Sequence, residues 1–203
     1  MKINKKLLLS IFFFVLFLIF LILVLLGKSE GFDNFIYQSI SFFRCSFLDN
    51  YFIFITKFAN ALIIVFVVLI FLLITRNRYG VFLLVSSIDA VIMTTLIKVV
   101  VKRVRPEELR LISQGGYSFP SGHSMMSICV YGYLLYLAIK HIKNKIIKIL
   151  VSSILFLVIL SIGVSRIYVG VHFASDVLAG FSLGISYLCL LIYVLEKYEV
   201  QGG

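Results

Sequence analysis

The segment Phe119-Pro120-Ser121-Gly122-His123 interrupts a strongly apolar sequence, and the rest of the chain is arranged around it. The apolar segments on either side are long enough to cross a bilayer. A basic run lies just before the segment, and a second polar stretch, Ser165 to Asp176, lies after it. The chain has three histidines, and two of them fall in these two polar stretches. Histidines and arginines at one membrane edge indicate chemistry on an anionic substrate.

The composition excludes an ordinary soluble domain. The 203 residues are 62% hydrophobic, with a mean hydropathy of +1.11, whereas soluble domains are about 45–50% apolar. A helical span takes about 20 apolar residues, so the length accommodates roughly six spans with short loops. We therefore expect one all-α integral membrane domain over residues 1–203. The three cysteines predict no disulfide framework.

Six transmembrane helices are expected, and the first is followed by an amphipathic segment. The apolar segments are Leu7–Gly27, Tyr51–Thr75, Val81–Val101, Ser121–Ile139, Ile146–Val164 and Val171–Leu195. The first is longer than a typical signal-peptide core, so we expect it to remain uncleaved. Residues 28–50 repeat apolar side chains at helical spacing, which predicts an amphipathic helix in the membrane interface. A loop that dips into the headgroups is the alternative.

Two charged residues lie inside the expected spans. Lys57 lies near the start of the second span, where its side chain can snorkel to the surface and needs no partner. Asp89 lies near the middle of the third span. An acid at that depth is either a functional residue or a carboxyl group hydrogen-bonded to a neighbouring helix.

The basic residues of the loops predict how the chain is oriented. With a cytoplasmic N-terminus, that side carries Lys2, Lys5, Lys6, Arg76, Arg78, Lys140, Lys143, Lys145, Lys148 and Lys197. The outer side carries Lys28, Arg44, Lys98, Lys102, Arg103, Arg105, Arg110 and Arg166. The first set follows the positive-inside rule. The second departs from it only around the two polar stretches, which indicates anion binding. Nucleic acid is excluded as a partner, because these charges are divided among short loops.

Three cations and one helix start are candidates for binding that anion. Lys98 and Arg105 are seven residues apart, which places them on one face if the helix continues, and Arg166 comes from the second polar stretch. Guanidinium groups bind phosphate oxygens through two hydrogen bonds. Ser121 and Gly122 open the fourth span, where free backbone N–H groups attract anions. The Ser121 hydroxyl either joins the anion site or only caps the helix.

Three titratable residues are candidates for catalysis. His172 and Asp176 are four residues apart, which places them one turn apart on the same helix face. A carboxylate there fixes the tautomer of the imidazole and leaves its other nitrogen free to attack. His123 would then protonate the leaving oxygen. Taken singly, each has a plainer interpretation: Asp176 as a first-turn acid and the histidines as interfacial side chains.

The order of these residues resembles the three-part signature of the type 2 phosphatidic acid phosphatase superfamily, in its bacterial membrane lipid phosphatase branch. The signature positions are Lys98, Arg105-Pro106, Pro120-Ser121-Gly122-His123, Ser165-Arg166, His172 and Asp176. The motif-bearing core is residues 98–184. The superfamily also includes glucose-6-phosphatase and the vanadium haloperoxidases.

The resemblance implies a role for each residue. His172 is the nucleophile that forms a phosphohistidine, Asp176 supports it, and His123 protonates the leaving group. The phosphoryl oxygens are held by Lys98, Arg105, Ser121, Gly122 and Arg166. No metal or other cofactor is implied. Lys102, Arg103 and Arg110 match no signature position. We interpret them either as positive charges that attract anionic headgroups or as residues of a solvated loop.

We expect a metal-independent membrane lipid phosphatase in the cell membrane, with its site on the extracytoplasmic face and both termini in the cytoplasm. Its substrate would be undecaprenyl diphosphate, phosphatidylglycerophosphate or phosphatidic acid, with the bilayer as its surroundings. A lipid phosphotransferase would use the same residues with another acceptor. An anion channel is disfavoured, because the spans show no repeat symmetry. The sequence predicts no oligomeric state, and the small pair Gly180 and Gly184 could pack helices within or between protomers.

Overall fold

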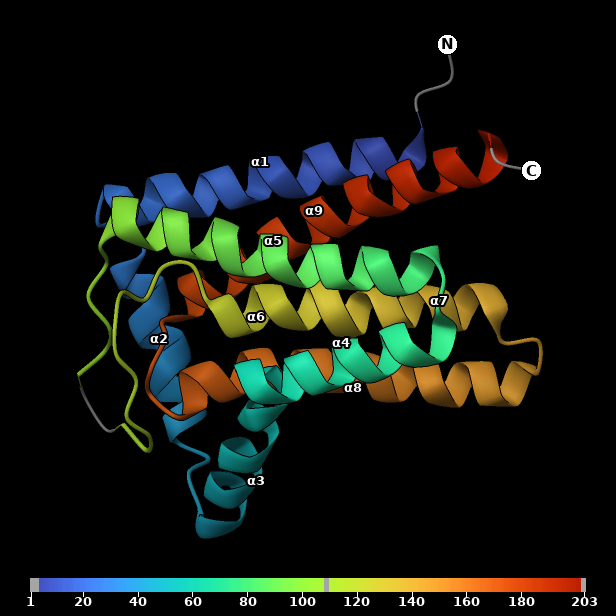
Figure 1. Ribbon diagram of the computed structural model, residues 1–203. Coiled ribbons are helices and arrows are strands. Elements are labelled where there is room, and N and C mark those ends of the chain that lie inside the picture. Colours follow the sequence, from blue (N-terminus) through green and yellow to red (C-terminus); the bar gives the residue numbers. More distant parts are fainter. Residues whose placement is uncertain (1–3, 108–109, 202–203) are drawn as a thin grey trace.

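The computed structural model describes residues 4–107 and 110–201, and these residues form helices and no strand. The helices are α1 (Lys5–Leu25), α2 (Glu30–Ser41), α3 (Ser46–Thr56), α4 (Ala61–Thr75), α5 (Arg78–Val101), α6 (Gly122–Ser127), α7 (Tyr133–His141), α8 (Lys145–Tyr168) and α9 (Ala174–Gln201). The 3₁₀ turn η1 (Lys57–Ala59) precedes α4, and the π-helical segment η2 (Ile128–Gly132) joins α6 to α7. The all-α class is confirmed (Figure 1).

Five helical segments in this part of the chain are long and apolar enough to cross a membrane. They are Lys5–Leu25, Arg78–Val101, Gly122–His141, Lys145–Tyr168 and Ala174–Tyr198. The second expected span, Tyr51–Thr75, corresponds to two helical segments, Ser46–Ala59 and Ala61–Thr75, that meet at an angle of 51°. Helix α9, which corresponds to the sixth expected span, starts at Ala174, three residues later than expected from the sequence.

The prediction of an unbroken helix over Tyr51–Thr75 is wrong at Asn60. The backbone of Asn60 is extended, with φ −71° and ψ 144°, so the helical hydrogen-bond pattern stops there. The Tyr131 hydroxyl donates a hydrogen bond of 2.6 Å to the carbonyl of Phe58. A side chain from η2 thus satisfies a carbonyl near the break, which an apolar environment would otherwise leave unpaired.

The predicted amphipathic helix over residues 28–50 is shorter and turned differently from the expectation. Helix α2 ends at Ser41, and α3 begins at Ser46. Apolar residues of α2 divide between two faces: Ile36 and Ile40 pack against the end of α8 and the start of α9, whereas Phe35 is 67% exposed. The expectation placed these residues on one face. Asp33 lies on the packed face and is 1% exposed.

The segment α6–η2–α7 runs through the middle of the bundle, against α5, α8 and α9 (Figure 1). Its side chains Met125, Cys129 and Tyr133 are completely buried. An added Cβ at Gly180 of α9 would lie 2.5 Å from the Ser121 carbonyl oxygen, and one at Gly184 would lie 2.9 Å from Ile128 Cβ. The small pair therefore packs α9 against α6 and η2 within the bundle.

The ends of the bundle differ in what they carry. The N-terminal end of α1 and the C-terminal end of α9 lie together at one end of the bundle, and the loops that contain the two polar stretches lie at the other (Figure 1). Between them, the Tyr187 hydroxyl of α9 donates a hydrogen bond to Asp89 of α5. Of the two interpretations of Asp89, the structure therefore favours a carboxyl group hydrogen-bonded to a neighbouring helix.

Candidate active site

Backbone hydrogen bonds bring the two polar stretches together. The Ser121 N–H donates to the carbonyl of Asp176 over 2.9 Å, which joins the start of α6 to the first turn of α9. The loop before α6 is held in the same way, since the Ser118 N–H donates to the Arg103 carbonyl over 2.8 Å. Residues about fifty positions apart in the sequence therefore face each other across a short distance.

His172 is held between a guanidinium group and a carboxylate. Its Nε2 lies 2.9 Å from Nη1 of Arg105, and its Nδ1 lies 3.4 Å from Oδ2 of Asp176. Because arginine only donates hydrogen bonds, Nε2 must be the accepting nitrogen and Nδ1 carries the proton. The backbone N–H of Phe173 donates to the same Asp176 oxygen over 2.9 Å. The neutral ring therefore has its lone pair on the side of the cations.

Arg105 organises the loops around this ring. Its Nη1 also donates to the Val171 carbonyl over 2.8 Å, its Nε donates to the Gly116 carbonyl over 2.9 Å, and its Nη2 donates to the Tyr117 carbonyl over 3.1 Å. A planar fork with fixed donor directions suits this set of acceptors better than a point charge.

Lys98 and Arg105 do meet, but not along one helix face. Helix α5 ends at Val101, and Lys102 has a left-handed φ of 52°, so the helix does not continue to Arg105. The two side chains converge instead on one carbonyl, since Lys98 Nζ donates to Tyr117 over 2.7 Å and Arg105 reaches the same oxygen. The helix therefore does not continue as the predicted shared face required, but the two side chains still lie close together as predicted.

Arg166 approaches from the end of α8 and is 1% exposed. Its Nη1 donates to Oγ1 of Thr56 over 2.6 Å, and its Nη2 donates to Oε1 of Gln114 over 3.1 Å. Its Nε is buried without a hydrogen-bond partner among residues 4–107 and 110–201. A charged donor that is buried and only partly paired is suited to binding an anion.

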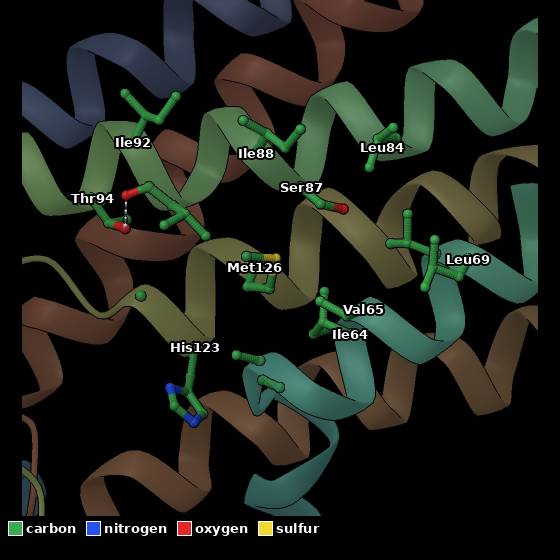
Figure 2. A pocket seen from close by; sticks show the side chains of 15 residues that line it. Ile64, Val65, Leu69, Leu84, Ser87, Ile88, Ile92, Thr94, His123 and Met126 are labelled. Carbon is green, nitrogen blue, oxygen red and sulfur yellow. Dashed lines mark hydrogen bonds between the residues drawn. The ribbon is translucent and has the colours of Figure 1, made fainter.

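The three consecutive residues at the start of α6 have different roles in the structure. Ser121 caps the helix: its Oγ accepts hydrogen bonds from the Ser124 N–H at 3.3 Å and the Ser124 hydroxyl at 2.8 Å. A Cβ added at Gly122 would meet only Thr94 Oγ1, at 3.7 Å, so packing within the protein does not require glycine there. His123 points away from α6, toward the start of α4 and the C-terminal part of α8 (Figure 2).

Two residues that contact the site, Arg103 and Asp33, are not among those predicted from the sequence. Arg103 Nη1 lies 2.7 Å from Oδ1 of Asp176, and Nη2 lies 2.7 Å from Oδ2 of Asp33. The guanidinium group also covers the Phe173 ring, 4.1 Å from its centroid. Asp33 accepts hydrogen bonds from the Ser175 N–H and hydroxyl, both over 2.8 Å. Helix α2 is thereby linked through Arg103 to the carboxylate beside His172.

The interpretation of Arg103 as a charge that attracts headgroups or as part of a solvated loop is therefore wrong, while Lys102 and Arg110 are exposed as a loop residue would be. One sequence signal was available for Asp33. It precedes Ile36, Tyr37 and Ile40 by three, four and seven residues, so it shares their helix face. An acid on the packed face of a helix needs a cation, and Arg103 supplies it.

Replacing Asp33 with asparagine is expected to destabilise the fold. The change leaves Arg103 with one carboxylate instead of two, and loss of a charged hydrogen-bond partner costs about 1–3 kcal/mol. The free energy of unfolding in detergent measures it. Glu30→Gln, an exposed change on the same helix, is the matched control and should stay within about 0.5 kcal/mol of the wild type. Equal stability of both variants would contradict the role of this ion pair.

The electrostatic environment favours the neutral form of His172. Burial, followed by the positive charges of Arg166, Arg105 and Lys98, holds the pKa of His172 well below its ordinary value of 6.5. Each of these effects penalises the imidazolium ion. His172 therefore stays unprotonated, and able to attack, at pH values where an ordinary histidine would be largely charged.

If His172 is the nucleophile, as the resemblance implies, the acid limb of kcat/KM is expected below pH 6.5, because activity is then lost as pH falls through the lowered pKa of His172. Arg166→Gln should move the limb of the residual activity toward higher pH, since it removes the largest of the positive charges that lower this pKa. A pH profile of phosphate release measures both. A wild-type limb at or above pH 6.5 would contradict the assignment.

Comparisons with known proteins identify the family. Residues 78–199 match the model of the PAP2 superfamily. Phosphatidylglycerophosphatase B of Bacillus subtilis (strain 168) is 36% identical over 121 residues, which are 58% of this chain and 56% of that protein. An undecaprenyl-diphosphatase of Sulfolobus acidocaldarius is 27% identical over 202 residues, covering 89% of this chain and 91% of that protein.

Two solved structures share the fold. The crystal structure of a transmembrane PAP2-type phosphatidylglycerolphosphate phosphatase from Bacillus subtilis superposes with a TM-score of 0.83 at 29% identity, covering 93% of this chain and 96% of that one. That of Aquifex aeolicus LpxE gives 0.62 at 27% identity, covering 76% and 92%. By this similarity, the helical membrane bundle is of the membrane phosphatase class. The chain belongs to the PAP2 superfamily.

Proposed function

We propose that the protein is a membrane lipid phosphatase that removes the terminal phosphate of a lipid through a phosphohistidine on His172. The observation that carries this proposal is an apolar groove of about 470 Å³ that lies between α4 and α5 and ends at His123 (Figure 2). The groove runs along the side of the bundle rather than toward the loops. A substrate with a long apolar chain fits it, and a soluble phosphate ester does not need it.

The lining of the groove has two parts. Most of it consists of aliphatic side chains, among them Ile64, Val68 and Ile88, which suit an acyl or prenyl chain. Gly122 and His123 also line the groove, and Figure 2 shows His123 at one end of it. A chain in the groove would bring its headgroup to the start of α6. The free space where a Gly122 side chain would project is then available to the substrate.

The first step of the reaction forms the phosphohistidine. Arg105, Arg166 and Lys98 bind the phosphoryl oxygens and neutralise the charge that spreads over them in the transition state. The phosphate displaces the Arg105 N–H from Nε2 of His172, which attacks the phosphorus atom. The bond from phosphorus to the leaving oxygen breaks as His123 gives that oxygen a proton.

The second step releases inorganic phosphate. His123, now neutral, takes a proton from a water molecule, and the water oxygen attacks the phosphorus atom. The bond from phosphorus to Nε2 breaks, and His172 returns to its neutral form. Asp176 stabilises the imidazole as its charge rises and falls, and Arg103 holds Asp176. Each proton and each bond is accounted for by these residues and one water.

The site would lie on the extracytoplasmic face. Supporting this, Arg76 follows the last residue of α4, and Arg78 and Lys145 begin α5 and α8. All three lie at the end of the bundle opposite the site, where the positive-inside rule places cytoplasmic charges. The two termini would then be cytoplasmic.

The test is phosphate release by the purified full-length protein from a polyprenyl diphosphate, phosphatidylglycerophosphate and phosphatidic acid in mixed micelles. At least one lipid should be hydrolysed, and activity should survive excess EDTA, because the proposed steps need no metal. Product analysis with an added lipid alcohol separates hydrolysis from phosphoryl transfer. No release from any of the three lipids, or a loss in EDTA that magnesium restores, would contradict the proposal.

A further inference from the structure

We propose that the break between α3 and α4 forms a subsite for a second phosphate on the leaving group, with Lys57 as its cation. The inference rests on the proposed function and narrows its substrate class to lipids whose leaving group is itself anionic. A lipid diphosphate and a phosphatidylglycerol phosphate belong to this class. Phosphatidic acid does not, because its leaving group is a neutral diacylglycerol.

The subsite is a second cavity beside His123, of about 440 Å³. Its lining is more polar than that of the first groove. Its lining includes Lys57 and Asn60 from the break, Gln114 from the loop before α6, and Arg166 from α8. His123 and Ala61 line both this cavity and the apolar groove, so the two are adjacent.

The position of the cavity matches the direction in which the leaving group departs. Arg166 lines the cavity. Its guanidinium group is buried, and its Nε has no hydrogen-bond partner among the described residues. His123, the proposed acid, must contact the leaving oxygen and also lines the cavity. The atoms beyond that oxygen therefore enter the space between His123 and Lys57. The lipid chain continues from there past Ala61 into the apolar groove.

The break explains why a lysine is present at this point. In an unbroken span, Lys57 would have to snorkel toward the membrane surface, as its sequence position first suggested. The bend of 51° ends the helical pattern at Asn60 and lets both polar side chains line a cavity instead. Lysine and amide donors are suited to phosphate oxygens. A neutral glycerol backbone would not need the ammonium group.

The charge also serves the chemistry. When the terminal phosphoryl group moves to Nε2 of His172, the bond to the leaving oxygen breaks and His123 protonates that oxygen. For a diphosphate, the departing group retains one phosphate and its negative charge, next to the apolar groove. A cation beside that phosphate lowers the barrier for departure and has no comparable effect on a departing alcohol.

The test compares Lys57→Gln with the wild type on two lipids, a polyprenyl diphosphate and phosphatidic acid, in identical micelles. We expect kcat/KM for the diphosphate to fall about tenfold or more, as for loss of a charge-assisted hydrogen bond, and kcat/KM for phosphatidic acid to change less than about twofold. Lys57→Arg, which keeps the charge, should retain most of the preference for the polyprenyl diphosphate over phosphatidic acid. Lys28→Gln replaces an exposed lysine at the same end of the bundle and should change kcat/KM for neither lipid.

The outcomes separate this inference from the proposed function. Equal losses on both lipids would overturn the subsite, since Lys57 would then serve folding or binding in general. An unchanged ratio of the two kcat/KM values in Lys57→Gln would overturn it as well. If the wild-type protein released phosphate from neither lipid nor from phosphatidylglycerophosphate, the proposed function itself would fail.

Discussion

His172→Ala is expected to lower phosphate release by about 10⁴-fold or more, as loss of a nucleophile does in other enzymes. The imidazole accepts the Arg105 N–H at Nε2 and faces Asp176 at Nδ1, so alanine removes the attacking atom and leaves both partners in place. Phosphate release at saturating lipid measures the loss. Size-exclusion elution and thermal unfolding check that the variant folds.

The third histidine provides the matched control. His141 lies at the end of α7, far along the bundle from α6, and its ring contacts Tyr79. His141→Ala removes the same side chain at the opposite end and should keep near wild-type activity. Near wild-type turnover by folded His172→Ala would exclude the nucleophile assignment.

Arg105→Lys is expected to lower kcat/KM by about 10²–10³-fold, a loss typical for removal of one preorganised donor to a developing anion. The charge is retained, but the planar fork that joins Gly116, Tyr117 and Val171 to the ring of His172 is lost. Lysine has a single nitrogen and cannot reach these acceptors together. Both the loop geometry and the binding of phosphoryl oxygens should suffer.

The control for Arg105→Lys is Arg110→Lys, an exposed change in the same loop, which should have little effect. Inhibition by inorganic vanadate, a mimic of the phosphoryl group in transfer, should weaken in Arg105→Lys and stay unchanged in Arg110→Lys. Equal kcat/KM values for Arg105→Lys and the wild type would show that only the charge at this position matters.

Much of the fold follows from the sequence because apolar length is a direct signal in membrane proteins. The segments around Val81–Val101 and Ile146–Val164 needed no tertiary information. The break at Asn60 is different. Lys57 and Asn60 interrupt the apolar run there, but the two flanking helices together are still apolar enough for a span, so hydropathy alone does not reveal the bend. The hydrogen bond to the Phe58 carbonyl comes from Tyr131, more than seventy residues away in the sequence.

The candidate site was predicted as a set of residues but not as a geometry. The spacing of His172 and Asp176 predicts that they lie close together on one helix face. The structure has Nδ1 and Oδ2 3.4 Å apart, but α9 begins at Ala174, so His172 lies just before the helix and not on its face. Arg103 could not be assigned in this way. Its two partners lie on α2 and α9, so its role depends on how three distant segments pack together.

The most direct test of the account is to trap the covalent intermediate on His172. Full-length protein would be mixed with phosphatidylglycerophosphate or a polyprenyl diphosphate that carries radioactive phosphorus in the terminal phosphate, then quenched in base within milliseconds and digested. We expect acid-labile, base-stable label on the peptide that contains His172, and none in His172→Ala. Phosphate release by the wild type at full rate, with no label on that peptide at any quench time, would contradict it.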